Sequence, residues 1–574
     1  MPALLAPVRQ TKPTGGELFL PTAPSDAELY AYLGPQRRWV LLVMTGAFAC
    51  ASISLFRFST HQWILAPFLC VLALNAVCTV ISLRSGQNTR RISRVSHQSL
   101  TGLWNPARIP SVDVFLPTAG EPLEVLANTY AHVAAMSWPG TLRVYVLDDS
   151  AREEVERAAL AAGFTYLSRP DRGQWKKAGN LRFGFDHSDG DLIAVFDADF
   201  CPRPDYLFHL VPYLDDPKVG IAQSPQCFET RPEMGWLQRT AGATQELFYR
   251  WVQPSRDAAG APICVGTCAV YRRSALAEVG GFALIEHSED VHTGVKLLSG
   301  GYVTRYVPVQ IARGMCPDDL AGFCNQQYRW CTGSMSLLAS KDFHSLSLTW
   351  RQRACFWSGF LYYVSTAVNV FLLHLPGLVM EFGYPEDIRA SHFLVLLPAA
   401  WVWLVLLPVV FRSRWRFEVL RVQMVYSFAH AVAIWHVLRG RTAGWVPTGS
   451  LGAGGAGSGG SGGGGGNGGG SGARLARTIT IVAVVWLGGY TIAAWVGIVA
   501  GVMTYGLDAF WLMAAFVAGY TYLVVPLVLD GIRLLTGQPA GRRVAAAPSA
   551  RRSAPVLTAH STVTGAVTVD RTAE

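Results

Sequence analysis

Two aspartates, Asp197 and Asp199, stand at the end of an apolar run that reads LIAVFDADF over residues 192–200. Such a run is typical of a buried strand, and the turn that follows a strand can bring both carboxylates to one rim. Paired carboxylates repel each other unless a cation lies between them, and oxygen ligands suit Mg²⁺ or Mn²⁺. The pair therefore indicates a divalent-cation site, with a solvated acidic turn as the alternative.

A second acid pair, Asp148 and Asp149, follows the strand-like run LRVYVL. Strand-like and helical runs alternate in this region: strands at 112–117, 142–147, 164–167 and 191–196, helices at 121–136, 151–162 and 176–187. This alternation predicts a parallel sheet covered by helices, with ligands bound beyond the carboxyl ends of the strands. All four carboxylates should therefore share one edge. The alternative for the second pair is an N-cap of the helix at 151.

The chain is too apolar for an ordinary soluble protein, since 51% of its 574 residues are hydrophobic and 15% are charged. Six stretches without Asp, Glu, Lys or Arg are long enough to cross a bilayer: 39–56, 64–83, 354–380, 391–411, 478–507 and 509–529. They form three hairpins, and arginines flank one end of each. By the positive-inside rule both termini and residues 85–353 are cytoplasmic.

The remaining composition excludes other classes of protein. The net charge of +9 is concentrated in the membrane flanks and the basic tail, which favours lipid headgroup contact over nucleic-acid binding. Eleven cysteines without a C-x-x-C pair favour free thiols over a zinc or disulfide framework. No signal peptide is expected, because the mostly polar segment 1–38 precedes the first apolar stretch. We expect a multi-pass protein of the plasma or inner membrane.

Four further motifs follow in chain order: KKAGN (176–180), GTCAVYRRSAL (266–276), EHSEDVHTG (286–294) and QQYRW (326–330). With the two acid pairs they resemble the membrane-integrated family 2 glycosyltransferases of the cellulose synthase group, over about residues 110–340. The resemblance implies an α/β fold class: a cytoplasmic GT-A-type nucleotide-sugar transferase domain inserted between transmembrane hairpins, with about six membrane helices plus interfacial helices.

The resemblance also implies roles for individual residues. Asp290 would be the catalytic base with Glu289 beside it, and Asp197 and Asp199 would hold Mg²⁺ or Mn²⁺. The residues implied in nucleotide-sugar binding are Asp148, Asp149, Lys177, Asn180, Asp197, Gln326, Arg329, Trp330, Trp445 and Thr448. Those implied in acceptor binding are Gly266, Thr267, Cys268 and Trp330.

Each of these assignments has a plainer alternative. Lys177 could be a surface charge, Arg329 and Trp330 an interfacial pair, and the segment with Trp445 and Thr448 an ordinary turn rather than a gating loop. The chain also departs from the group's pattern. Phe200 stands where relatives often carry His, and the gating-loop-like segment lacks the expected lysine.

The predicted organisation has eight segments. They are an N-terminal cytoplasmic segment that is partly disordered (1–38), a first membrane hairpin (39–84), the transferase domain with interfacial helices (85–353), a second hairpin (354–411), an interfacial helix with the gating-loop-like segment (412–448), a Gly-rich disordered linker (449–473), a third hairpin (474–533) and a disordered cytoplasmic tail (534–574).

The function expected is a processive, inverting β-glycosyltransferase that polymerises glucose from UDP-glucose and moves the glucan across the membrane. Its partners would be the donor, the growing polysaccharide, the bilayer and accessory cell-envelope proteins, without nucleic acid. UDP-N-acetylglucosamine or GDP-mannose as donor, and a non-processive anchored transferase, are the alternatives. A transporter or lipid-binding scaffold would require a broken acid set, and the set is complete. The aromatic residues Trp357, Phe360, Tyr362 and Tyr363 either line a channel or form an interfacial belt.

Overall fold

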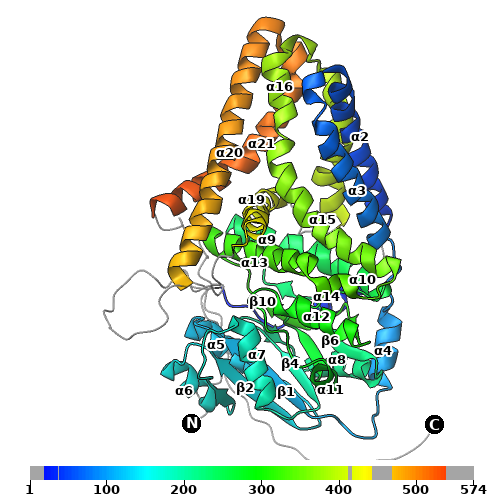
Figure 1. Ribbon diagram of the computed structural model, residues 1–574, viewed down its shortest axis with the longest axis vertical. Helices are drawn as coiled ribbons and strands as arrows, with labels where there is room; N and C mark the ends of the chain where they lie inside the picture. The colour runs from blue at the N-terminus through cyan, green and yellow to red at the C-terminus, as the bar shows by residue number, and fades with distance from the viewer. Residues whose placement is uncertain (1–18, 36–37, 411–416, 442–467, 538–574) are drawn as a thin grey trace, which may run out of the picture.

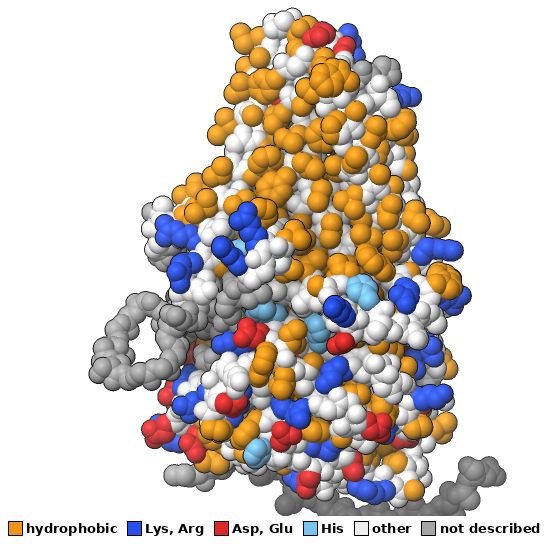
Figure 2. Space-filling view, viewed as in Figure 1, with side chains coloured by type: hydrophobic (Ala, Val, Ile, Leu, Met, Phe, Trp, Pro, Cys, Tyr) orange, Lys and Arg blue, Asp and Glu red, His pale blue; other side chains and the backbone are white. Residues whose placement is uncertain are grey.

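Two parts are stacked along the long axis of the molecule, an α/β part below and a bundle of long helices above (Figure 1). This computed structural model describes residues 19–35, 38–410, 417–441 and 468–537. The upper surface in Figure 2 is largely hydrophobic, whereas charged side chains of both signs cover the lower part. The chain therefore divides into a polar domain and a part suited to lipid.

The central sheet of the described chain has seven strands in the order β3-β2-β1-β4-β8-β6-β9. Its strands are β1 (Val112–Thr118), β2 (Leu142–Asp148), β3 (Thr165–Leu167), β4 (Leu192–Val195), β6 (Val219–Gln223), β8 (Ala269–Arg272) and β9 (Val303–Tyr306). The four predicted strands are confirmed as β1 to β4 and are parallel. The expectation of a wholly parallel sheet is wrong, because β8 is antiparallel to β4 and β6.

The reversed direction of β8 matters for the site. Ala269, its first residue, pairs with Val195, the last residue of β4. The segment before β8 therefore lies at the edge where β1, β2 and β4 end, which we call the carboxyl edge. A small second sheet, β5 (Cys201–Pro202), β10 (Ala312–Gly314) and β7 (Cys227–Phe228), adjoins the domain.

Helices cover both faces of the sheet, which explains why every residue of β1 is buried. Alternate residues of β1 enter two core clusters: Val114 and Leu116 belong to one and Phe115 to the other. The three predicted helices of this region are confirmed as α5 (Leu123–Ala134), α6 (Glu153–Ala161) and α7 (Lys176–Asp186). The other helices of the domain are α4 (Arg94–Gly102), α8 (Tyr206–Leu210), α10 (Gln253–Ala258), α11 (Arg273–Glu278), α12 (Glu289–Ser299) and α14 (Lys341–Ser345), with the 3₁₀ turn η3 (Val211–Asp215).

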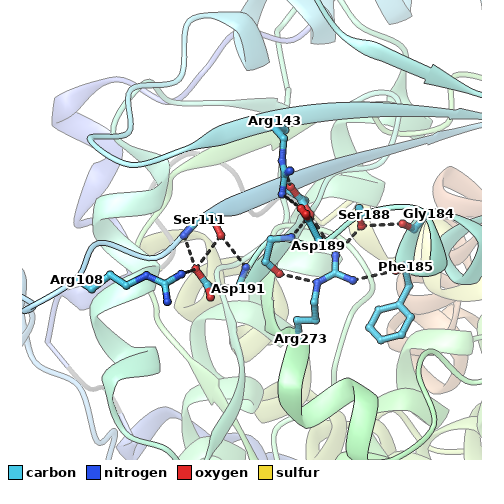
Figure 3. Close-up of polar contacts among 11 residues, drawn as sticks. Arg108, Ser111, Arg143, Gly184, Phe185, Ser188, Asp189, Asp191 and Arg273 are labelled. Atoms are coloured by element: carbon cyan, nitrogen blue, oxygen red, sulfur yellow. Dashed lines mark hydrogen bonds and ion pairs between the residues drawn. The ribbon is translucent and has the colours of Figure 1, made fainter.

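An ion-pair network closes the opposite edge of the sheet, where the strands begin (Figure 3). Asp113 of β1 is fully buried and accepts hydrogen bonds from Arg143 Nε at 2.9 Å and Arg273 Nη2 at 3.2 Å. Arg273 also donates to the backbone oxygens of Gly190 and Phe185. One arginine from the start of α11 thus joins β1 to the segment that follows α7.

We expect Arg273→Ala to lower the free energy of unfolding by about 3 kcal/mol, because it removes one cation from a buried carboxylate. Thermal unfolding of the full-length protein measures the loss. Arg108→Ala is the matched control, since Arg108 pairs with Asp191 at the surface and should change stability by less than about 1 kcal/mol. Equal shifts in the two variants would contradict a structural role for the buried network.

Within the described residues, six helical stretches are long and apolar enough to cross a membrane. They are Trp39–Arg57, Phe68–Gly86, Trp350–Gly383, Ala390–Val410, Gly470–Tyr505 and Leu507–Thr536. The helices that form them are α2 (Trp39–His61), α3 (Phe68–Gly86), α15 (Trp350–Leu372), α16 (Leu375–Gly383), η6 (Ala390–Leu396), α17 (Leu397–Trp401), η7 (Val402–Leu406), α18 (Leu407–Val410), α20 (Gly468–Tyr505) and α21 (Leu507–Thr536). The short turns η2 (Trp63–Leu65) and η5 (Pro385–Asp387) lie in the connections of the first two hairpins. A reciprocal amide pair, Asn75 with Asn369, ties α3 to α15 with bonds of 2.8 and 2.7 Å.

Helix boundaries differ from the predicted ones at the third hairpin. The predicted linker extends to residue 473, but α20 begins at Gly468, so residues 468–473 are helical. A helix propagates more easily than it nucleates, and the apolar span behind these glycines carries the helix into them. Residues 449–467 lie outside the described part. At the other end, α21 extends to Thr536 and takes the first residues of the predicted tail.

Three helices lie beneath the membrane helices: α9 (Trp236–Leu247), α13 (Leu320–Ala339) and α19 (Val419–Leu438). Figure 1 shows α19 nearly along its axis, across the direction of α20, as expected for the interfacial helix predicted there. Pro526 in α21 has no N–H group, which frees the carbonyl of Tyr522. Arg421 of α19 donates to that oxygen at 2.9 Å and so fastens the crossing helix to the last membrane helix.

Candidate active site

Acidic side chains gather at the carboxyl edge of the sheet. Asp197 and Asp199 follow β4, and Glu121 follows β1. Burial and the negative charges of Asp197 and Glu121 raise the pKa of Asp199 to about 7. Burial likewise raises the pKa of Glu121. Glu121 is not among the predicted site residues, although it follows a predicted strand as Asp197 does.

Lys177 connects this acid cluster to the loop before β8. Its Nζ donates to Asp197 and, at 3.0 Å, to the backbone oxygen of Gly266, and it lies 3.7 Å from a carboxylate oxygen of Glu289. Burial alone would lower the pKa of Lys177, but the carboxylates of Asp197 and Glu289 raise it above its usual range. The lysine is therefore a charged member of the site, and the surface alternative is wrong.

Asp290 lies in the first turn of α12, against the same loop. A Cβ atom on Gly266 would lie 2.8 Å from the Cβ of Asp290, and the φ of Gly266 is +72°, so only glycine fits there. Burial and the neighbouring Glu289 raise the pKa of Asp290. A carboxylate with a raised pKa at the carboxyl edge is suited to accept a proton.

The motif on α13 faces these acids. Gln326, Arg329 and Trp330 are spaced i, i+3 and i+4, so they share one side of the helix. Burial lowers the pKa of Arg329, and the carboxylates of Glu289, Asp197 and Asp290 oppose that lowering.

The contact between α13 and α12 depends on Gly333, where a Cβ would lie 1.9 Å from the Ser288 hydroxyl oxygen. Because glycine permits that contact, the positive charge of Arg329 comes close to Asp290.

The second acid pair is bonded within the protein. Asp148 is fully buried and accepts hydrogen bonds from the Arg152 backbone nitrogen at 3.1 Å and the Tyr166 hydroxyl at 3.0 Å. Asp149 accepts two from Arg169, from Nε at 2.6 Å and Nη2 at 2.7 Å. Arg169 is 1% exposed. Both acids therefore shape the carboxyl edge. Asp148 holds the backbone at Arg152, where the chain enters α6, which is near the N-cap position named as its alternative role.

Several other predicted residues lie apart from the open site. Asn180 is buried and donates to the Leu147 backbone oxygen at 2.5 Å, so it holds α7 against β2. The Thr267 hydroxyl accepts a bond from the Asp197 backbone nitrogen at 2.8 Å. The side chains of Thr267 and Cys268 are fully buried, so they cannot line an acceptor entrance as expected. Trp445 and Thr448 lie outside the described residues.

A cavity of about 960 Å³ leads away from Asp290. Ser288, Asp290 and Trp330 line it near the acid cluster, together with Cys264 and Val265, which take the place expected for Thr267 and Cys268. Other parts of its wall come from α15 and α19 and include Phe360, Tyr362, Tyr363 and Tyr426. The fourth predicted aromatic residue, Trp357, is not in the lining and is 40% exposed. Three of the four predicted aromatic residues therefore line the cavity, and the fourth, Trp357, suits an interfacial belt.

The acid cluster fits a hard divalent cation better than a soft one. Among the described side chains, His, Cys, Asp and Glu do not gather in threes at metal-binding distance, so the protein does not enclose a metal by itself. Mg²⁺ is usually held by one or two carboxylates together with substrate phosphates. Burial and the negative charges of Asp197 and Glu121 raise the pKa of Asp199, and the positive charge of Lys177 only partly opposes this. Two oxygen donors in that field suit Mg²⁺ or Mn²⁺.

Residues 192–413 match the family model described as Glycosyl transferase family group 2. The chain is 34% identical over 305 residues to the cellulose synthase catalytic subunit [UDP-forming] of Pseudomonas fluorescens (strain SBW25), covering 52% of this chain and 41% of that protein. It is 32% identical over 303 residues to cellulose synthase 1 of Komagataeibacter xylinus, covering 52% of this chain and 19% of that protein. The chain thus spans less than half the length of these relatives. Among solved structures, the mannosyltransferase PcManGT from Pyrobaculum calidifontis in complex with GDP-Man and Mn2+ matches with a TM-score of 0.40 and 17% identity, covering 68% of this chain and 99% of that one.

Residues 192–413 are therefore similar to the family group 2 glycosyltransferases, and the α/β domain is set between hairpins of apolar helices long enough to cross a membrane. The predicted fold class, an α/β domain between such hairpins, is confirmed. The chain is similar to cellulose synthases, as the order of its motifs predicts.

Proposed function

We propose that the protein is a processive, inverting glycosyltransferase that builds a β-linked glucan from UDP-glucose. The position of Asp290 is the observation that carries the proposal. It lines the cavity together with Trp330, and the charges of Glu289, Lys177 and Asp197 act on it. A base there can accept the proton of a sugar hydroxyl that enters from the cavity while the donor lies on the acids.

The donor would lie along the carboxyl edge, with its diphosphate near the positive charges of Lys177 and Arg329. Both groups face the acid cluster and would meet the charge that develops on the leaving group. Asp148 and Asp149, held by Tyr166 and Arg169, would shape the part of the edge that receives the base and ribose.

A divalent cation, Mg²⁺ or Mn²⁺, would be held by Asp197 and Asp199, and when bound it would supply charge neutralisation to the diphosphate. The negative charge of Glu121 acts on Asp199, but the three described carboxylates do not gather at metal-binding distance. The names of the relatives that carry the label UDP-forming favour a uridine nucleotide as leaving group.

The growing chain would leave through the cavity and between the membrane helices. Trp330, Tyr362 and Tyr426 line the cavity and would offer aromatic faces to the apolar faces of sugar rings. The arginine flanks favour a cytoplasmic domain, so that the polymer moves outward.

A donor screen tests this function. The full-length protein in lipid is supplied with radiolabelled UDP-glucose, UDP-N-acetylglucosamine or GDP-mannose, and polymer is separated from free nucleotide. Label incorporated from UDP-glucose into a product that β-glucanase degrades is the expected result. Incorporation from another donor alone would leave the proposed transfer reaction in place but change the sugar that is polymerised. Release of free sugar without polymer would show that the protein is not a polymerase.

The turnover number should fall as the pH drops, because Asp290 acts as a base only in its carboxylate form. Burial and Glu289 raise its pKa, so the acidic limb should lie well above the ordinary aspartate value of about 3.9. Turnover measured against pH at saturating donor and metal checks this. A flat profile down to about pH 5, or a limb that moves with the metal concentration, would contradict the assignment to Asp290.

A further inference from the structure

The segment before the first membrane helix is built into the transferase domain. Residues 19–35, which we call the strap, contain α1 (Asp26–Leu29) and the turn η1 (Ala31–Leu33). At its start, Asn128 donates to the Pro21 backbone oxygen at 2.9 Å, and Arg203 donates to that of Pro24 at 2.8 Å. The strap is therefore attached to α5 and to the segment before α8, far along the chain.

Arginines hold the second half of the strap. Arg313 pairs with Glu28 at 2.6 Å, and Arg250 donates to the Ala31 backbone oxygen at 2.9 Å. Arg90 donates to three successive groups, the backbone oxygens of residues 32, 33 and 34, at 2.9 to 3.1 Å. These bonds fix the path of the backbone from Glu28 to Gly34.

The strap forms one wall of the cavity that begins at Asp290. Its residues in the lining are Glu28, Ala31, Tyr32, Gly34 and Pro35. The lining also holds Trp330 and aromatic residues of α15. The strap and Asp290 therefore border the same cavity.

Tyr32 and Tyr30 differ in direction although they are close in sequence. Arg250 lies over the Tyr32 ring at 4.5 Å, and Tyr32, which is 5% exposed, packs with Tyr249, another lining residue, and with the buried Tyr306. Arg94 lies over the Tyr30 ring at the same distance of 4.5 Å, but Tyr30 packs edge-on against His97 of α4 and is not part of the lining. The two tyrosines thus make similar cation–π contacts, and only Tyr32 borders the cavity.

We propose that the strap is the acceptor-holding wall of the cavity and that Tyr32 is an acceptor-binding residue, its aromatic side chain contacting a β-linked glucose unit of the chain. This inference rests on the proposed function. Arg250 fixes the ring from one side, so the contact costs little side-chain entropy when sugar binds. The strap would close the cavity on its own side, and the chain would remain beside Asp290 between additions.

Binding of cellohexaose to the full-length protein in lipid nanodiscs, measured by calorimetry, tests the inference without catalysis. Tyr32→Ala should weaken binding about tenfold, a loss within the range of one aromatic contact. Tyr30→Ala is the matched control and should bind as the wild type does. Tyr32→Leu keeps a large apolar side chain in the cluster and removes the aromatic face, so it should also weaken binding and covers the case in which the alanine variant does not fold.

Equal weakening in the Tyr30 and Tyr32 variants would show that the strap only supports the fold, and unchanged binding in both Tyr32 variants would remove Tyr32 from the acceptor site. Either result overturns the inference, and so does a wild type that does not bind cellohexaose. The donor screen is judged separately. If the wild type makes polymer from UDP-glucose and the Tyr32 variants bind cellohexaose unchanged, only the acceptor-binding role of the strap is rejected. If the protein binds cellohexaose but transfers sugar from no donor, only the proposed function is rejected.

Discussion

Asp199→Asn should abolish sugar transfer while the protein remains folded. The substitution removes a buried negative charge that Asp197 and Glu121 repel, and burial with these two charges raises the pKa of Asp199 to about 7. Relief of that repulsion should leave the melting temperature unchanged or higher, while the metal loses a ligand. Asp197→Asn should be equally inactive, but it also breaks the contact with Lys177 and is the less clean variant.

Calorimetric titration with Mn²⁺ and UDP separates this account from a structural one. Both aspartate variants should lose the metal-dependent part of UDP binding, and EDTA should have the same effect on the wild type. The exposed Asp318→Asn provides the matched control, because it makes the same chemical change outside the cluster. Full activity in either cluster variant, or undiminished wild-type activity in EDTA, would show that these aspartates do not hold a metal.

Asp290→Asn should lower turnover by about 10²–10⁴-fold, the usual contribution of a general base, and leave donor affinity near that of the wild type. The asparagine keeps the size of the side chain against Gly266 but cannot take a proton at the pH of the reaction. Turnover and UDP affinity are measured in parallel. Glu286→Gln, an exposed position in the segment just before α12, is the control. If UDP affinity collapsed with turnover, Asp290 would be a binding residue and another group would be the base.

The sequence predicts the elements of the site because their signals are local. Apolar runs located β1, β2 and β4, and the acids that follow them lie at one edge, as the parallel direction of these strands requires. The same reasoning could have included Glu121, which also follows a strand. The direction of β8 was not accessible in this way, because its partners are strands far away in sequence.

Side-chain direction within loops could not be predicted. Thr267 and Cys268 lie in a loop that the motif identifies, yet they point into the core, while Cys264 and Val265 line the cavity. The defined structure of the strap could not be predicted for a related reason. It depends on Arg90, Arg250 and Arg313, which are distant in sequence and form no periodic pattern with it.

The central claim is that the carboxyl edge, the cavity and the membrane helices form one path for the polymer. The location of the product tests this claim most directly. The protein is reconstituted in sealed vesicles with the transferase domain outside, supplied with radiolabelled UDP-glucose and metal, and then treated with β-glucanase before and after detergent. We predict long polymer inside the lumen, resistant to the enzyme until detergent opens the vesicles. Products of one or two sugars, or polymer that the glucanase degrades in intact vesicles, would show instead a simple transferase that its helices anchor to the membrane.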